Sequence, residues 1–244
     1  MAAHQRIIRE QLAVTEPRPA APSLAGYSIA AISRAEALPL ILRYEWLGTL
    51  GRATFFAGLL SSKGELEGAV CFGYGPSGPI RQLISEPALC LERGACVHYA
   101  PANAASFLIN GACRLACRSL GVERFFAYAD PNAGEYGGVY QAAGWVYLGQ
   151  GLDNGKVRAR RRFVLRPGDD PARPENWVTT RALRRATKMN YEQARARGWQ
   201  VEWRPAKHVY ATHVGESRWE TINGRRIDVW RQSFPPRPYP KPDR

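Results

Sequence analysis

Titratable and aromatic side chains gather in one glycine-rich stretch, ADPNAGEYGGVYQAAGWVYLG, residues 129–149. Asp130 ends an apolar run, where it could act as a general base, a metal ligand or a cap of the PNAG loop. Glu135 could orient a substrate amine or lie in solvent. Tyr140, on an expected short helix, could protonate a departing group or pack as a core aromatic. The stretch is therefore either a tight corner or a catalytic site.

A second carboxylate with chemical potential is Glu45, in the stretch YEWLG. Its neighbours Tyr44 and Trp46 would provide an apolar environment if the side chain were buried, and burial raises a carboxyl pKa toward the value that a general base requires. The alternative is a solvated position on an ordinary amphipathic helix. Glu45 is thus a catalytic candidate that depends on burial.

The elements that must position these residues alternate between helix and strand. Ser33 and Glu36 have capping-box spacing before an expected helix over 32–50, which Pro39 must interrupt or bend. Asn103 and Gly121 mark the ends of another helix. At its start, Pro101 to Ser106, free backbone N–H groups could meet an anionic group, or Asn103 and Ser106 could simply be caps. Further expected elements are a hairpin over 54–75, strands over 94–100, 124–130 and 145–151, and a short helix over 137–144.

This order of elements resembles the acyl-CoA N-acetyltransferase (GNAT) superfamily. It predicts an α/β fold with a GNAT-like mixed, mostly antiparallel sheet flanked by helices, and a basic C-terminal α+β extension. A narrower resemblance is carried by the stretches YEWLGTL, GELEGAVCFG, RGACVHYAPANAAS, ADPNAGEYGGVYQAAGWVYLG and PAKHVY. Through these stretches, over residues 40–212, the chain resembles the phage Mom-like family of DNA adenine modification proteins.

The family resemblance implies transfer of a carbamoylmethyl group to N6 of adenine in phage DNA, which protects that DNA from host restriction. It also implies that Arg93 binds an anionic donor group and that Ser106 hydrogen-bonds the donor. Asn103 and Gln141 complete the expected donor site, and Ser106 joins Tyr140, Asp130 and Glu45 as a catalytic candidate. We expect double-stranded DNA as the partner, with the adenine flipped or locally exposed.

The sequence departs from acetyltransferases where their glycine-rich pyrophosphate loop should precede the long helix. Here the chain reads HYAPANAAS, with no glycine between Gly94 and Gly111. The sequence therefore leaves two kinds of group donor possible: acetyl-CoA, or another acyl or glycyl-type donor. His98, expected in the middle of a strand, is interpreted as a core histidine. No zinc-ligand spacing occurs, although an iron held by Glu, Asp and His from distant positions is compatible with the sequence.

Positive charge is concentrated in the last part of the chain. Residues 151–244 carry 22 Lys/Arg against 10 Asp/Glu, whereas residues 1–150 carry 12 against 11. Such asymmetry is typical of a polyanion-binding surface attached to a neutral body. One helical stretch capped by Thr179 or Thr180 carries charges that we expect on more than one face. The predicted DNA-binding residues are Arg181, Arg184, Arg185, Lys188 and Lys207, with Trp46 and Tyr136 as stacking partners for an extruded base.

The predicted domain organisation has four parts: an N-terminal, peripheral arm (1–25), a GNAT-like catalytic core (26–166), a basic extension packed on the core (167–234) and an extended, mobile Pro-rich tail (235–244). The five cysteines show no paired motif and indicate reduced, buried thiols in a cytoplasmic protein, here of a phage-infected cell. We expect no membrane association, and a homodimer is one option for assembly. The alternatives to DNA modification are an N-acetyltransferase for a small amine or protein and a non-catalytic DNA-binding protein.

Overall fold

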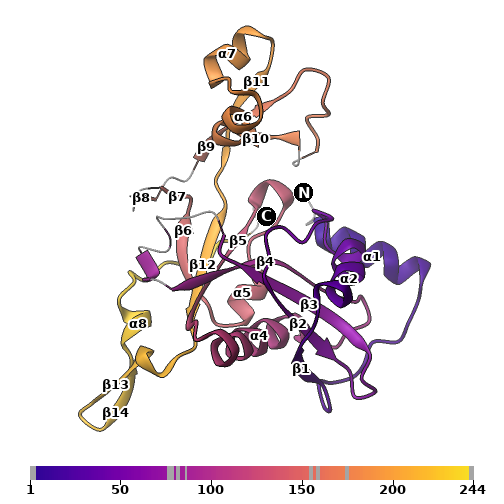
Figure 1. The fold of residues 1–244 in the computed structure, drawn as a ribbon, viewed down its shortest axis with the longest axis vertical. Coiled ribbons are helices and arrows are strands. Elements are labelled where there is room, and N and C mark those ends of the chain that lie inside the picture. The colour runs from indigo at the N-terminus through magenta and orange to yellow at the C-terminus, as the bar shows by residue number, and fades with distance from the viewer. Residues whose placement is uncertain are drawn as a thin grey trace.

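The main body is a seven-stranded sheet with the order β1-β2-β3-β4-β5-β12-β6 (Figure 1). The computed structural model describes residues 4–75, 80, 83–85, 87–153, 156–157, 160–173 and 176–241. Its strands are β1 (Ser28–Ala31), β2 (Phe55–Leu60), β3 (Leu66–Gly73), β4 (Ala88–Cys96), β5 (Arg124–Ala129), β12 (His208–His213) and β6 (Val146–Gln150). Neighbouring strands are antiparallel except β4 and β5, which run parallel. The predicted mixed, mostly antiparallel sheet is therefore confirmed.

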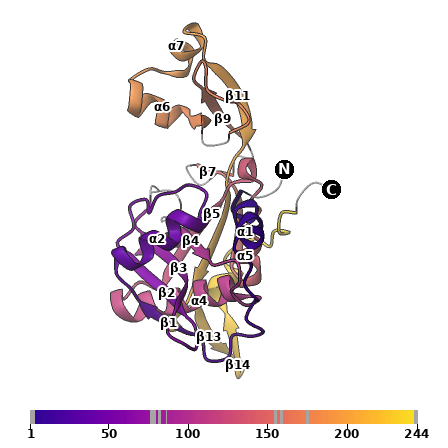
Figure 2. The same ribbon diagram turned by 90° about the vertical axis from the view of Figure 1, so that its right-hand side faces the viewer.

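Helices flank the sheet, with α2 (Arg34–Tyr44) on one face and α4 (Ala104–Leu120) and α5 (Gly138–Ala142) on the other (Figure 2). The capping box of Ser33 and Glu36 is present at the start of α2, and the helix continues through Pro39 rather than stopping there. Helix α4 ends at Gly121 with a φ of 68°, as predicted for a glycine C-cap. Local signals therefore locate the start of α2 and the end of α4, whereas α2 ends at Tyr44 and not at residue 50 as predicted.

Strand β4 begins earlier and ends earlier than the sequence predicts. Residues 88–91 are apolar and buried, so they belong to the strand that was expected only from residue 94. The strand stops at Cys96 because the chain then turns, with Ala100 N donating to Val97 O at 3.2 Å. His98 consequently follows the strand. Its ring nitrogens meet Tyr44 Oη at 3.3 Å and Glu16 O at 2.8 Å, so it is a satisfied histidine outside the sheet.

The basic segment forms a small unit of its own, which we call the insert module, residues 160–205. It consists of the three-stranded sheet of β10 (Val178–Thr179), β9 (Arg160–Leu165) and β11 (Gln200–Pro205), with helices α6 (Thr180–Thr187) and α7 (Tyr191–Ala196). The module projects from one end of the main body (Figure 1). The predicted division at residue 166 differs from this arrangement, because β9 belongs to the module and β12 returns to the main sheet.

The single helical stretch expected after Trp177 is two helices. Thr179 Oγ1 accepts from Ala182 N at 3.2 Å, which is the predicted N-cap of α6. Lys188 then adopts a φ of 62° and ends α6, while Asn190 forms a capping box with Gln193 that starts α7. A left-handed residue cannot continue a helix, so the break is local in origin.

Both chain ends pack on the body. The N-terminal helix α1 (His4–Thr15), predicted to be peripheral, lies at β4, where Gln5 Nε2 donates to Gly94 O at 2.9 Å. In the tail, Tyr239 Oη donates to Trp145 O at 2.7 Å, and the Tyr239 ring stacks on Tyr210. Residue 239 is thus held on the body rather than in a mobile tail, and α1 contacts a strand of the main sheet, because a distant glutamine and tyrosine find backbone acceptors there.

The remaining elements are short. They are η1 (Pro131–Ala133), β7 (Leu152–Asp153), β8 (Lys156–Val157), η3 (Glu216–Arg218), β13 (Trp219–Ile222), β14 (Arg225–Asp228) and α8 (Val229–Gln232). All five cysteines are free thiols, and four of them are buried. In the described part of the chain, no helix combines the length and the apolar composition needed to cross a bilayer.

Candidate active site

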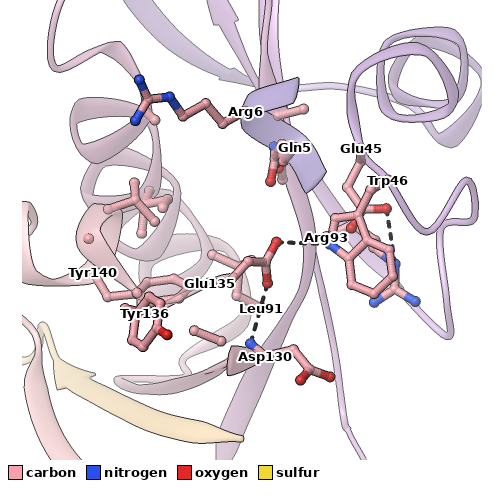
Figure 3. A pocket seen from close by; sticks show the side chains of 18 of the residues that line it. Gln5, Arg6, Glu45, Trp46, Leu91, Arg93, Asp130, Glu135, Tyr136 and Tyr140 are labelled. Atoms are coloured by element: carbon pink, nitrogen blue, oxygen red, sulfur yellow. Dashed lines mark hydrogen bonds and ion pairs between the residues drawn. The ribbon is translucent and has the colours of Figure 1, made fainter. Parts of the chain in front are cut away.

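A cavity of about 990 Å³ opens beside the one parallel strand pair of the sheet. Strands β4 and β5 pair only as far as Leu91 and Ala127, after which β4 follows β3 instead, with Arg93 opposite Cys71. The wedge between the diverging strands is closed by α5, by the segment after α2, and by Gln5 and Arg6 of α1 (Figure 3). The topology therefore places a deep, water-accessible hollow at the end of β5.

Nine residues that the sequence selects line this cavity together. They are Glu45, Trp46, Arg93, Asp130, Glu135, Tyr136, Tyr140, Gln141 and Lys207. They come from four separate stretches of the chain, and Figure 3 shows several of them facing a common space. The long-range convergence of residues selected for their chemistry distinguishes this cavity from an ordinary loop corner.

Glu45 is the C-cap residue of α2, and its side chain is buried at 7% exposure. Leu47 N donates to Glu45 Oε2 at 2.8 Å, and Arg93 Nε lies 3.7 Å from the same oxygen. Burial raises the pKa of the Glu45 carboxyl to about 7, against the opposing effects of Arg93 and the Leu47 N–H. A carboxylate with this pKa can accept a proton near neutral pH.

Glu135 is a second carboxylate with a perturbed pKa in the same cavity. Trp46 Nε1 donates to Glu135 Oε1 at 2.8 Å, and Asp130 N lies 3.4 Å from Glu135 Oε2. Burial raises the Glu135 pKa, while these two donors lower it. The sequence left Glu135 between an amine-orienting and a solvated role, and the structure removes the solvated one.

Tyr140 lies on α5 and packs between the rings of Trp145 and Tyr210, at centroid distances of 5.2 and 5.3 Å. Burial raises the pKa of its phenol far above the usual range, so the group stays a neutral proton donor. Within the described chain its hydroxyl has no hydrogen-bond partner. Gly137, just before α5, has a φ of 74°, and a Cβ there would lie 2.3 Å from the Tyr210 ring. A glycine is required to bring Tyr140 into this position.

Asp130 is a cap, which was one of the roles that the sequence left open, and it also faces the cavity. Its Oδ1 accepts from Asn132 N at 3.0 Å and thus caps η1. Its Oδ2 lies 3.3 Å from Lys207 Nζ. This ion pair joins the end of β5 to the segment before β12. Because Asp130 also lines the cavity, its carboxylate sits at the junction between the cavity wall and the base of the insert module.

Gln141 has partners within the protein rather than a free amide. Its Nε2 donates to Tyr136 O at 2.9 Å and to Tyr210 Oη at 3.1 Å, and Tyr210 Oη itself donates to Tyr136 O. These bonds hold the backbone of the loop that presents Tyr136 to the cavity. The geometry therefore favours a positioning role for Gln141 over the donor contact expected from the sequence.

Asn103 and Ser106 lie outside the main cavity, at a separate hollow of about 280 Å³ beside the start of α4. Asn103 occupies the N-cap position with a φ of 65° and makes no side-chain cap bond, and Ser106 Oγ donates to Asn103 O at 3.0 Å. The structure thus does not bring these two residues to Glu45 and Tyr140. Ser106 is not placed to be a catalytic partner of those groups.

The start of α4 does not offer the cradle that a CoA pyrophosphate needs. No glycine lies between Cys96 and Ala104, so side chains stand where close backbone approach is required. Helix α1 adds Arg9 to the edge of the small hollow. We therefore assign no chemical step to CoA.

An iron site formed by distant carboxylates and histidines is not assembled either. Over the residues that the structure describes, no three His, Cys, Asp or Glu side chains gather closely enough to hold a metal ion. Glu45 and Asp130 instead engage Arg93 and Lys207. These two carboxylates are thus paired with cations of the protein itself.

A serine, a histidine and a glutamate also meet at the far end of β12. His213 Nε2 lies 3.0 Å from Glu123 Oε2 and 3.2 Å from Ser217 Oγ, while Ser217 Oγ donates to Glu123 at 2.6 Å. The same ring nitrogen faces both partners, so the histidine cannot relay a proton between serine and carboxylate. We interpret this cluster as a tie between β12 and the start of β5.

The fold is a mixed, mostly antiparallel α/β sheet flanked by helices, and its cavity lies beside the parallel pair of β4 and β5. A sequence model of the Mom protein family matches residues 26–196, and the chain therefore belongs to the Mom protein family. No curated protein sequence matches it.

Solved structures similar to the chain include two acetyltransferases. One is the ribosomal-protein-S5-alanine acetyltransferase from Vibrio fischeri, with 9% identity, a TM-score of 0.40, and coverage of 78% of this chain and 94% of that one. The other is spermidine N-acetyltransferase from Vibrio cholerae in complex with CoA and spermine, with 11% identity, a TM-score of 0.40, and coverage of 78% and 96%.

Proposed function

We propose that this protein is a DNA-modifying transferase that places a carbamoylmethyl group on N6 of adenine and so protects phage DNA from host restriction. The family match over residues 26–196 supports this assignment. The observation that carries it is the meeting of Glu45, with a pKa of about 7, and the neutral Tyr140 in one cavity that also holds aromatic rings. A proton acceptor, a proton donor and stacking surfaces are the groups that this reaction needs.

The adenine must leave the duplex to react, because its N6 amine is engaged in pairing. Trp46 and Tyr136 line the cavity as half-buried rings, and each is fixed by a hydrogen bond at a polar or backbone atom. An extruded base can stack against such rings, and each stack contributes about 1–3 kcal/mol. The rings would then hold the base with its N6 amine inside the cavity.

Proton transfer follows from the two titratable groups. The N6 nitrogen forms a bond to the methylene carbon of an activated carbamoylmethyl or glycyl-type donor, and the bond from that carbon to its leaving group breaks. The Glu45 carboxylate takes the proton that N6 loses, and the Tyr140 phenol donates one to the leaving group. Arg93, 3.7 Å from Glu45, stabilises the carboxylate in its charged form before the transfer.

Expression in a bacterium followed by nucleoside mass spectrometry tests the assignment. Deoxyadenosine heavier by one carbamoylmethyl group is expected from cells with wild-type protein and absent with Glu45→Gln. Unmodified DNA in the presence of folded protein would contradict the proposal. Acetylated small amines or proteins, together with thermal stabilisation by acetyl-CoA, would identify an N-acetyltransferase instead. DNA retention with no product would identify a binding protein.

A further inference from the structure

The insert module carries charge that the main fold does not need. It joins β6 to β12, which are neighbouring antiparallel strands that a short hairpin could connect. Residues 160–205 hold 12 Lys/Arg against 5 Asp/Glu, whereas the whole chain has a net charge of +13. More than half of the excess therefore sits in a unit that projects beyond the sheet (Figure 1). The core of the main sheet does not depend on this module, so the module has another role.

Helix α6 concentrates this charge on one face. Arg181, Arg184 and Arg185 have i, i+3 and i+4 spacing, so their side chains share an arc of roughly 100°. Leu183 points the other way and is buried with Val164 and Ala194. The expectation that these charges lie on several faces is thus wrong for α6, because the helix has one buried and one basic side. Lys188 ends the helix next to this face.

Across the part of the chain that the structure describes, these cations have no counter-charge partner. Arg181, Arg184, Arg185 and Lys188 are exposed, and none makes a side-chain hydrogen bond or ion pair within the described residues. Arginines at i and i+4 repel each other by a few tenths of a kcal/mol. The helix dipole favours Arg184 and Arg185 in the last turn but disfavours Arg181 in the first. Folding alone therefore does not account for the basic face.

Other arginines of the module act structurally, which makes the contrast informative. Arg162 lies over the Tyr191 ring at 3.7 Å, and Arg204 lies over the Trp177 ring at 3.6 Å. These side chains bridge β9 and β11 to α7 and to the segment before β10. The module thus uses one set of arginines for its own packing and leaves the α6 set toward solvent.

The base of the module is fixed to the cavity wall. Asn132 Nδ2 donates to Pro205 O at 3.0 Å, and Lys207 Nζ pairs with Asp130 at 3.3 Å. Asp130 and Lys207 both line the cavity. A long polyanion lying along the module can therefore continue past the cavity. A lipid surface is disfavoured, because the residue of α6 opposite the arginines, Leu183, is buried and cannot enter a bilayer.

We propose that the insert module is a sequence-independent clamp for the phosphate backbone of duplex DNA, with Arg181, Arg184, Arg185 and Lys188 as its contact face. This inference rests on DNA being the substrate of the proposed reaction. The clamp supplies affinity, and the cavity supplies chemistry. It explains why more than half of the net positive charge of the chain lies in a unit outside the main sheet.

Salt-dependent binding of a fluorescent duplex to the full chain tests the clamp. Four cations contribute about 3.6 to the slope of log K against log salt, at about 0.9 for each phosphate contact. The variant Arg181→Ala, Arg184→Ala, Arg185→Ala, Lys188→Ala should lose most of that slope. The matched control Lys63→Ala, Arg114→Ala, Arg118→Ala, Arg225→Ala removes the same charge from exposed positions of the body and hairpin. It should bind within about threefold of wild type.

Several outcomes decide the matter. Equal weakening by the two quadruple variants would reduce the effect to net charge and overturn the clamp, as would tighter binding to duplex RNA or to anionic vesicles. The triple variant Arg181→Lys, Arg184→Lys, Arg185→Lys keeps the positive charge and should retain the salt slope. It therefore distinguishes the loss of phosphate contacts from misfolding. If the wild type modifies DNA but the quadruple Ala variant keeps the wild-type salt slope, the clamp proposal is wrong and the proposed reaction stands. If the wild type binds DNA with a steep salt slope but does not modify it, only the proposed reaction is wrong.

Discussion

The indole Nε1 of Trp46 donates a 2.8 Å hydrogen bond to Glu135 Oε1, joining two stretches that lie 89 residues apart in the chain. Trp46 follows α2, and Glu135 lies in the loop after β5, so the bond links two walls of the cavity. It fixes the plane of an aromatic ring and the position of a carboxylate at the same time. The ring that we assign to base stacking is therefore oriented by a group that could also meet the substrate amine.

The substitution Trp46→Phe keeps an aromatic face but removes the donor. We expect modification activity to fall by about tenfold or more and unfolding free energy to fall by about 1 kcal/mol, the usual value of one hydrogen bond. The Glu135 pKa should rise further, since the Trp46 bond lowers it. Single-turnover assays and chemical denaturation measure these effects. Trp177→Phe is the control, because it also loses one indole bond, to Pro171 O at 2.9 Å, but outside the cavity. Equal activity losses would show that the Trp46 bond serves stability only.

The pKa of Glu45, about 7, predicts a pH dependence of the reaction. If Glu45 is the base, single-turnover rates of the wild type should rise about tenfold per pH unit below 7 and level off above it. Glu45→Gln should lower the plateau by about 100-fold or more and abolish this rise. A Glu36→Gln control alters a solvent-exposed carboxylate at the other end of the same helix and should leave the pH profile unchanged. A wild-type rate without a step near pH 7 would remove Glu45 from this role.

Glu45 also predicts how stability changes with pH. Its folded pKa lies above the unfolded value of 4.5, so burial of the protonated form costs little below pH 4.5 and the penalty grows as pH rises to about 7. The full penalty is at most roughly 3 kcal/mol, from about 1.4 kcal/mol per pKa unit. Glu45→Gln should therefore be relatively more stable at pH 8 than at pH 5, measured by denaturant midpoints against wild type. An equal difference at both pH values would contradict the buried, raised carboxyl.

Tyr140→Phe tests the proton donor. The ring should keep its packing between Trp145 and Tyr210, and its hydroxyl has no bonded partner in the described chain, so stability should change by less than about 1 kcal/mol. Activity should fall by about 100-fold if the phenol protonates the leaving group. Tyr147→Phe removes a hydroxyl that instead bonds His208 at 2.8 Å, and it serves as the control. Full activity in Tyr140→Phe would assign Tyr140 to the core.

Local signals predicted much of the fold. The capping box at Ser33, the glycine at 121 and the alternation of the 54–75 hairpin depend on neighbours within a few residues, and all appear as expected. The aromatic neighbours of Glu45 made it a candidate, but whether its side chain is buried depended on the fold, which buries it. Pairings between strands that lie far apart in the chain could not be predicted in this way. The placement of β12 between β5 and β6, across the whole insert module, depends on pairings that no short pattern specifies.

The candidate site shows the same limit. The string around Asp130 and Tyr140 identified one wall of the cavity, because its glycines and titratable groups lie close in sequence. The wall formed by Gln5 and Arg6 was missed, since a helical pattern does not reveal where a helix packs. Ser106 was included because it begins a helix after a strand. The cavity forms instead where β4 leaves β5, which the residues near Ser106 do not determine.

Asp130 and Lys207 permit a test that separates a structural cap from a functional charge. Asp130→Asn keeps an oxygen that can accept from Asn132 N but removes the charge that faces Lys207 at 3.3 Å. Because Lys207 is half-exposed, the pair contributes at most about 1 kcal/mol to stability, and Asp130→Asn, Lys207→Met and the double variant should all fold normally. We expect Asp130→Asn to reduce modification at least tenfold with DNA affinity almost unchanged, and Lys207→Met to weaken DNA binding several-fold. Rates and affinities in a double-mutant cycle measure the coupling between the two residues. If Asp130→Asn modifies DNA at the wild-type rate, the Asp130 carboxylate serves only as the cap of η1.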